Sequence, residues 1–246
     1  MSPAGIATSA KAVSLSAPAR FLQKYFYFLM SLLIAAVVVY GFSHTVNQTL
    51  IHPNPLPPWI LYLHAPVFCG WVLFFILQTA LIRTRNVPVH RTLGWFGLAL
   101  AISMVVLGYM TAVRMDRFHF LQTHDPGDAA FLAIQLMDVI NFATFFTLAI
   151  LWRKKPEFHR RLMLIATCTL LDAAFGRFPF LPLMFIPAGV DSLILLGVAR
   201  DLIVDHRIHK VYLYALPPLM AYQVFTMATF FSHAQWWVKT SQALIL

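Results

Sequence analysis

The sequence predicts an all-α fold, a polytopic membrane helical bundle of about seven transmembrane helices with its N terminus inside and its C terminus outside. Composition is the first reason, because 60% of the 246 residues are hydrophobic and 11% are charged, whereas soluble domains carry about a quarter charged residues. The second reason is a mean hydropathy of +0.73. The third is that Lys and Arg gather in alternate breaks between apolar runs, as is typical of cytoplasmic loops.

The N-terminal segment, residues 1–21, is rich in Ala, Ser and Pro and lacks apolar periodicity. It predicts a disordered cytoplasmic tail. The apolar run at 25–42 follows basic residues, as a secretory signal does, but it is longer than a typical signal core and lacks an A-x-A exit. We therefore interpret it as an uncleaved first helix.

Six more apolar runs have the length of about 20 residues that a membrane crossing needs. They lie at residues 58–82, 92–113, 129–152, 162–180, 183–198 and 211–231. Pro-rich and Asp-Pro-Gly sequences separate several of them and indicate turns. These runs predict a seven-helix domain at 22–232, followed by a periplasmic tail at 233–246.

Counting Lys and Arg in the breaks predicts the orientation. With the tail and alternate breaks in the cytoplasm, fourteen of these residues are inside and four are outside. The inside set is Lys11, Arg20, Lys24, Arg83, Arg85, Arg91, Arg153, Lys154, Lys155, Arg160, Arg161, Arg200, Arg207 and Lys210. The outside set is Arg114, Arg117, Arg177 and Lys239. This bias predicts a multi-pass protein of a bacterial inner membrane.

Several classes of function are disfavoured. The net charge of +9 lies in short loops between spans, so it does not indicate nucleic-acid binding. The sequence contains no GxSxG and no phosphate-binding P-loop. Its two cysteines, Cys69 and Cys168, form no CxxC motif. The expected partners are the lipid bilayer, anionic lipid headgroups at the cytoplasmic face and other membrane subunits.

Two cytoplasmic turns have similar sequences. The break after the second span ends in His90-Arg91, and the break after the fourth ends in His159-Arg160. Two hairpins of the same topology suggest parallel repeats, an arrangement that some transporters use. The alternative is that any short cytoplasmic turn collects Pro and Arg.

The sequence also resembles an uncharacterised bacterial integral-membrane family, known as a domain of unknown function. The resemblance rests on five features: His64-Ala65-Pro66-Val67-Phe68, Trp71 with Gln78, His90-Arg91-Thr92-Leu93-Gly94, His159-Arg160-Arg161-Leu162-Met163, and Arg177. It covers about residues 59–180. It implies a membrane location and carries over no activity.

Ionisable side chains inside the spans are the candidate site residues, because a charge at the centre of a membrane helix costs about 2.5–3.5 kcal/mol on insertion scales. At the midplane or in the outer half of the bilayer we expect His64, Asp138, Asn141, Asp172, Arg177 and Asp191. They suggest a polar pocket that binds a small ligand, an ion or a cofactor. The alternative is a buried network that joins helices. No tight spacing such as HxxxH supports a metal site.

A second group of candidates lies at the inner face, where two helices begin. Its members are His90, Arg91, His159 and Arg160. Helix N-termini beside Arg favour lipid phosphate or another anion. A second hypothesis is that His90 and His159 ligate haem b, since haem iron accepts axial histidine.

The leading hypothesis for function is therefore a multi-pass inner-membrane protein with a polar site in the outer half of its bundle. Three alternatives stay open: a haem b redox protein, a transporter coupled to ions or protons, and an assembly or anchor subunit without chemistry of its own. The sequence does not decide whether the protein is an enzyme.

Overall fold

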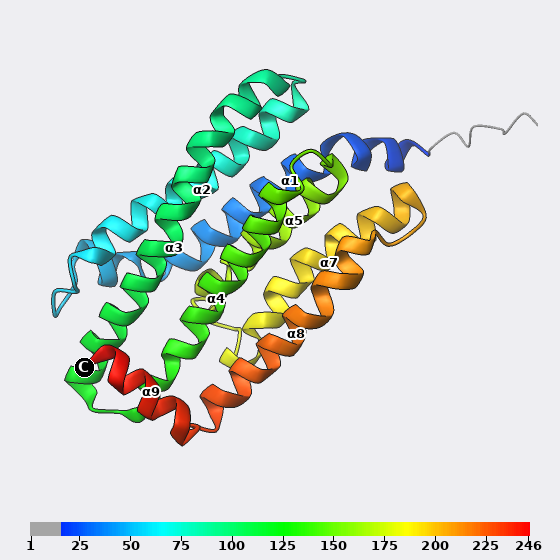
Figure 1. Ribbon diagram of the computed structural model, residues 1–246. Helices are drawn as coiled ribbons and strands as arrows, with labels where there is room; N and C mark the ends of the chain where they lie inside the picture. Colours follow the sequence, from blue (N-terminus) through cyan, green and yellow to red (C-terminus); the bar gives the residue numbers. More distant parts are fainter. Residues whose placement is uncertain (1–15) are drawn as a thin grey trace, which may run out of the picture.

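The computed structural model describes residues 16–246, and the regular secondary structure in this range is entirely helical (Figure 1). This confirms the predicted all-α fold for the described residues. The elements are α1 (Ala17–Ser43), the π-helical turn η1 (Asn47–Ile51), α2 (Ile60–Arg83), α3 (Val87–Thr123), α4 (Pro126–Leu151), α5 (Pro156–Cys168), α6 (Asp172–Phe175), the 3₁₀ turn η2 (Leu183–Phe185), α7 (Ile186–Asp205), α8 (Lys210–Phe231) and α9 (Gln235–Ile245).

The long helices run between two ends of the bundle. The turns at 84–86, 152–155 and 206–209 lie at the same end as the start of α1, toward the upper right of Figure 1. Contacts confirm this, because the rings of Phe158 and His209 are 4.9 Å apart. We call it the basic end, since most of the lysines and arginines follow or precede these turns. The opposite end holds η1, the α3–α4 turn and α9.

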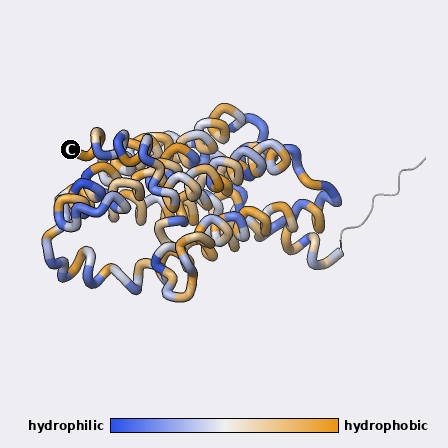
Figure 2. The backbone as a smooth tube through the Cα atoms, turned by 90° about the horizontal axis from the view of Figure 1, so that it is seen from below, coloured by the Kyte–Doolittle hydropathy of each residue, from blue (hydrophilic) through white to orange (hydrophobic). Residues whose placement is uncertain are grey.

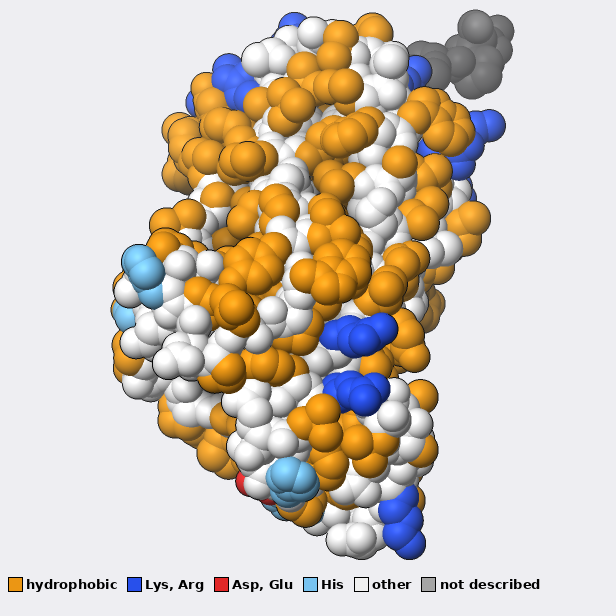
Figure 3. Space-filling view, turned by 90° about the vertical axis from the view of Figure 1, so that its left-hand side faces the viewer, with side chains coloured by type: hydrophobic (Ala, Val, Ile, Leu, Met, Phe, Trp, Pro, Cys, Tyr) orange, Lys and Arg blue, Asp and Glu red, His pale blue; other side chains and the backbone are white. Residues whose placement is uncertain are grey.

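Five segments of the described chain are long and apolar enough to cross a membrane. They are α1, α2, α3, α4 and Leu183–Asp205. Many of their large apolar side chains point outward; Leu73, Ile102 and Val106 are 67%, 58% and 52% exposed. The helices carry long hydrophobic stretches (Figure 2), and hydrophobic side chains cover the middle of the face in Figure 3. A soluble monomer rarely exposes so much contiguous apolar surface, so this chain is a multi-pass membrane protein in contact with lipid.

The expected fifth span, 162–180, is not one helix. The chain leaves the α-helix after Cys168, makes turns through residues 169–171, and forms the short helix α6 from Asp172. Two threonines accompany the break: Thr167 donates to the carbonyl of Met163 and Thr169 to that of Ala166. Such bonds from threonine to a preceding carbonyl often bend helices.

Other boundaries also differ from expectation. The first helix begins at Ala17, capped by Ser16, so residues 17–21 are helical; the rest of the expected tail lies outside the described residues. Helix α7 continues to Asp205, beyond the expected end at 198. Helix α8 matches the expected seventh span in position but is not among the five most apolar segments. The expected tail at 233–246 contains α9, whose Trp237 donates to the carbonyl of Ala130, 3.1 Å away.

The core lies where α1, α2, α4, α5 and α7 meet. Trp71 of α2 is 1% exposed and packs edge-on against Phe142 and Phe146 of α4. Close approach of the backbone completes the packing at Gly41, where a Cβ would overlap the carbonyl oxygen of Ala174 in α6. Helix α1 therefore holds the broken fifth segment in place.

Candidate functional site

The break between α5 and α6 positions the first residue of the candidate site. Asp172 begins α6 and its side chain is directed into the bundle, where the residue is 5% exposed. Helix α4 runs beside this segment, and Asp138 lies at its midpoint. The break thus places one buried carboxyl group beside the middle of a long apolar helix.

The carboxyl groups of Asp138 and Asp172 lie close enough to act on each other directly. In each group Oδ1 is buried and has no hydrogen-bond partner among the described residues. A carboxylate can only accept, so a hydrogen bond between two carboxyl groups requires that one of them carries a proton. We call these two residues the carboxyl pair.

Two further polar side chains approach the carboxyl pair. Asp191 of α7 is close enough for its charge to act on Asp172, and its Oδ1 accepts a hydrogen bond from Nε2 of Gln223, 3.2 Å away. Tyr222 of α8 is close enough to respond to the charge of Asp138. The site therefore draws on four of the packed segments: α4, α6, α7 and α8.

Arg177 makes its contacts within its own segment and with the end of α1. Arg177 donates to Oγ1 of Thr45, 3.0 Å away, and to the carbonyl of Ala173, and its guanidinium lies over the ring of Phe42. Among the described residues it forms no ion pair with Asp138, Asp172 or Asp191. Of the two roles open to Arg177, pairing with a buried aspartate or reaching outward from the helix end, the structure does not show the first.

His64 makes no hydrogen bond or ion pair with the carboxyl pair among the described residues, and it lies close enough to Arg177 for that charge to act on its ring. Its ring stacks on that of Phe68, with 3.9 Å between the centroids, and it faces Leu107 of α3. Its Nδ1 is buried without a hydrogen-bond partner in the part of the chain that the structure describes. His64 thus belongs to the α2–α3 contact.

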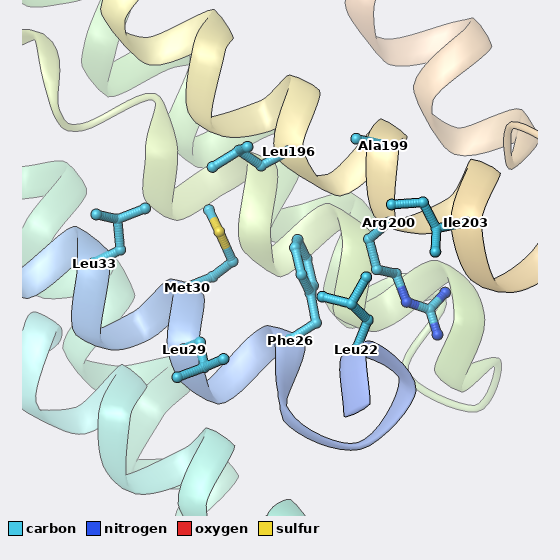
Figure 4. Close-up of a pocket in the computed structure, with 9 residues that line it drawn as sticks. All are labelled: Leu22, Phe26, Leu29, Met30, Leu33, Leu196, Ala199, Arg200 and Ile203. Atoms are coloured by element: carbon cyan, nitrogen blue, oxygen red, sulfur yellow. The ribbon is translucent and has the colours of Figure 1, made fainter. Parts of the chain in front are cut away.

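Asn141 lines a cavity between α4 and α8, one turn of α4 from Asp138. This cavity has a volume of about 370 Å³, and Tyr222 lines it as well. Asn141 is 7% exposed. A second cavity, of about 270 Å³, lies between α1 and α7; apolar side chains, Phe26 among them, form its wall and Arg200 stands at one end (Figure 4).

At the basic end the structure brings together the two histidines of the similar turns. His90 and His159 are each the fourth residue of their helix, and their ring centroids are 6.3 Å apart. Nδ1 of His159 is 2.9 Å from the carbonyl oxygen of Ala149. Arg160 pairs with Glu157, whereas Arg91 is exposed. Neither cavity is lined by either histidine, so the haem hypothesis stays a prediction.

A buried ion network that was not predicted from the sequence lies beside these histidines. Arg161 of α5 is 1% exposed and makes a two-point contact with Asp201 of α7, with N···O distances of 2.7 and 2.6 Å. Arg161 also contacts Asp205 and Glu157, and Arg200 contacts Asp201 and Asp205. The counting of loop charges had assigned Arg161 and Arg200 to the cytoplasmic loops.

Glu157 lies at the exposed edge of this network, before the expected fifth span. Burial acts to raise the pKa of its carboxyl group, but the hydrogen bond from Arg161 and the charges of Arg160 and Arg161 outweigh it, so the pKa lies below its ordinary value. The buried ion network could have been predicted from the spacing Arg-Asp-x-x-x-Asp at residues 200–205, which places two acidic residues one turn apart on one helix.

Within residues 16–246, no three side chains of His, Cys, Asp or Glu are arranged to hold a metal ion. No family model, curated protein or solved structure matches this chain. The candidate site must therefore be judged from its own geometry.

Proposed function

We propose that this chain crosses a bacterial inner membrane seven times, with its N terminus and basic end in the cytoplasm and its C terminus outside. The charge distribution supports this orientation, since the turns at one end carry most of the Lys and Arg. In this arrangement α5 and α6 together make the fifth crossing, and α8 the seventh. The basic end then faces anionic lipid headgroups. Contacts with other membrane subunits and the family resemblance stay predictions.

We propose further that the protein is a proton-coupled transporter, with the carboxyl pair as its proton-binding site. The observation that carries this proposal is that two buried carboxyl groups from different segments meet at an interrupted helix in the bundle. Interrupted helices near the bilayer midplane commonly form the binding sites of secondary transporters. Buried acidic groups in membrane spans commonly form proton relays.

The chemistry of the pair suits reversible proton binding. With a shared proton, the two groups satisfy each other; without it, two negative charges lie in contact in a medium of low dielectric constant, where repulsion is strong. Release of the proton is therefore favoured when another positive charge arrives. That is the exchange that couples proton movement to transport of a substrate.

Proton flux into proteoliposomes tests this function. The vesicles contain a pH-sensitive dye, and a potassium gradient with valinomycin imposes a membrane potential that is negative inside. We expect the wild-type protein to acidify the interior faster than protein-free vesicles do, and Asp138→Asn to return the rate to that of protein-free vesicles. Asp125→Asn, at an exposed cap, is the control and should behave as wild type. Equal flux through wild type and Asp138→Asn would rule the proposal out.

A further inference from the structure

The cavity between α4 and α8 has the character of a small-molecule site. Its volume of about 370 Å³ lies within the ~300–1,000 Å³ that is typical of ligand pockets, which are mostly apolar with a few placed polar groups. Toward the basic end its wall is aromatic, with Trp152 and Phe158. Toward the carboxyl pair its wall is polar, with Asn141 and Tyr222. The cavity therefore fits a molecule with an apolar body and one polar head.

Some hydrogen-bond acceptors on the wall of this cavity lack a donor within the described residues. Pro218 lines the cavity and has no N–H, so the carbonyl of Tyr214, four residues earlier on the same wall, lacks its helical donor. Asn141 is buried, and no described residue hydrogen-bonds to its side chain. These acceptors carry partial negative charge, which favours a positively charged ligand.

Charge distinguishes the two ends of the cavity. The ammonium groups of Lys155 and Lys210 lie 5.7 and 6.0 Å from the centroid of the Phe158 ring, at the basic end. At the other end, Tyr222 stands beside Asp138. A positive head is therefore repelled from the Phe158 end and attracted toward the carboxyl pair, where the ring of Tyr222 favours a cation as well.

We propose that this cavity binds a lipophilic organic cation, with its charge near Tyr222 and Asp138 and its apolar body against Trp152 and Phe158. This inference rests on the proposed function in one respect: binding of the cation displaces the proton of the carboxyl pair into solution. One positive charge then replaces another, so the net charge of the site does not change.

Calorimetric titration of the purified protein with tetraphenylphosphonium tests the proposal, and tetraphenylborate, of similar size and opposite charge, is the matched probe. We expect tetraphenylphosphonium to bind and tetraphenylborate to bind at least about tenfold more weakly, a difference of about 1.4 kcal/mol. Repeating the titration in buffers of different ionisation enthalpy counts the released protons. We expect release of a proton from wild type and none from Asp138→Asn.

Two matched variants locate the binding. Thr144→Trp fills the α4–α8 cavity, and Ala199→Trp fills the α1–α7 cavity, where the replaced residue is also small and exposed. We expect the first to weaken binding at least about tenfold and the second to leave it unchanged. Tyr222→Phe keeps the ring and removes the hydroxyl, so it should weaken binding without disturbing the fold.

The outcomes separate the two proposals. Equal binding of tetraphenylphosphonium and tetraphenylborate would overturn the inference. So would tetraphenylphosphonium binding that Thr144→Trp does not change. In either case the cavity would hold only a lipid tail. Loss of proton flux in Asp138→Asn without any binding of tetraphenylphosphonium would overturn the inference and leave the proposed function standing. Binding of tetraphenylphosphonium together with unchanged proton flux in Asp138→Asn would overturn the proposed function and leave the cation site standing.

Discussion

Two kinds of buried charge lie in this bundle, and they differ in how the charge is balanced. Arg161 and Asp201 have opposite charges and neutralise each other through two short contacts. Asp138 and Asp172 have the same charge when ionised, and in the function that we propose they share a proton. The Arg161–Asp201 pair is suited to holding helices together, and the carboxyl pair is suited to the binding and release of a proton.

Removing one partner of the buried Arg161–Asp201 pair should destabilise the protein strongly. Asp201→Asn leaves the guanidinium of Arg161 without its two-point partner, and breaking such a buried pair costs about 3–5 kcal/mol. Asp205→Asn changes a side chain that is 34% exposed, so we expect less than about 1 kcal/mol. Denaturant unfolding in detergent measures both variants. A smaller loss for Asp201→Asn than for Asp205→Asn would contradict this description of the network.

Which ionisable residues lie within spans can be read from the sequence more readily than their contacts can. Hydropathy predicts depth along each span, and the structure places the side chains of Asp138 and Asp172 inside the bundle. The rotation of each helix about its axis cannot be read in this way, so Arg177 and His64 were grouped with them although they face other neighbours. Charges near a span's end were assigned to water, which is why Arg200 was missed.

At the scale of elements, the interruption of the fifth segment determines the shape of the site. Hydropathy sums apolar residues over a window, and residues 162–180 are apolar whether or not the helix is continuous. The break depends on local hydrogen bonds of Thr167 and Thr169 and on packing against α1. Neither of these contributes to a hydropathy profile.

The contact of α1 with α6 gives a prediction about this element. Gly41→Ala would place a methyl group against the carbonyl oxygen of Ala174, and the backbone at that position cannot move aside as a side chain can. We expect a loss of about 1–3 kcal/mol in the free energy of unfolding, as for other overpacked positions.

The control for that contact is Gly70→Ala in α2, where a Cβ meets nothing within 4 Å. We expect it to be neutral or to stabilise its helix by up to about 1 kcal/mol. Thermal unfolding of the two variants in the same detergent makes the comparison. If Gly41→Ala were as stable as Gly70→Ala, the close approach of α1 to α6 would be refuted.

For the whole molecule, the surface and the interior indicate the same environment. Apolar side chains lie on the outside of the bundle, as lipid requires, while several ionisable groups, among them Arg161 with Asp201 and the carboxyl pair, lie inside it. The overall class could be read from the sequence because it depends on composition and charge placement alone. The exchange of protons that we propose depends on a single shared proton within this environment.

Infrared spectroscopy of the protein in lipid nanodiscs tests that shared proton directly, because a protonated carboxylic acid has a carbonyl stretching band that a carboxylate lacks. Asp116 of α3 is also buried, at 1% exposure, and can carry a proton of its own. We therefore expect a band in the wild-type protein at neutral pH that weakens in both Asp138→Asn and Asp172→Asn and keeps its intensity in Asp125→Asn. A wild-type spectrum without the band, or a band of wild-type intensity in both Asp138→Asn and Asp172→Asn, would contradict the shared proton.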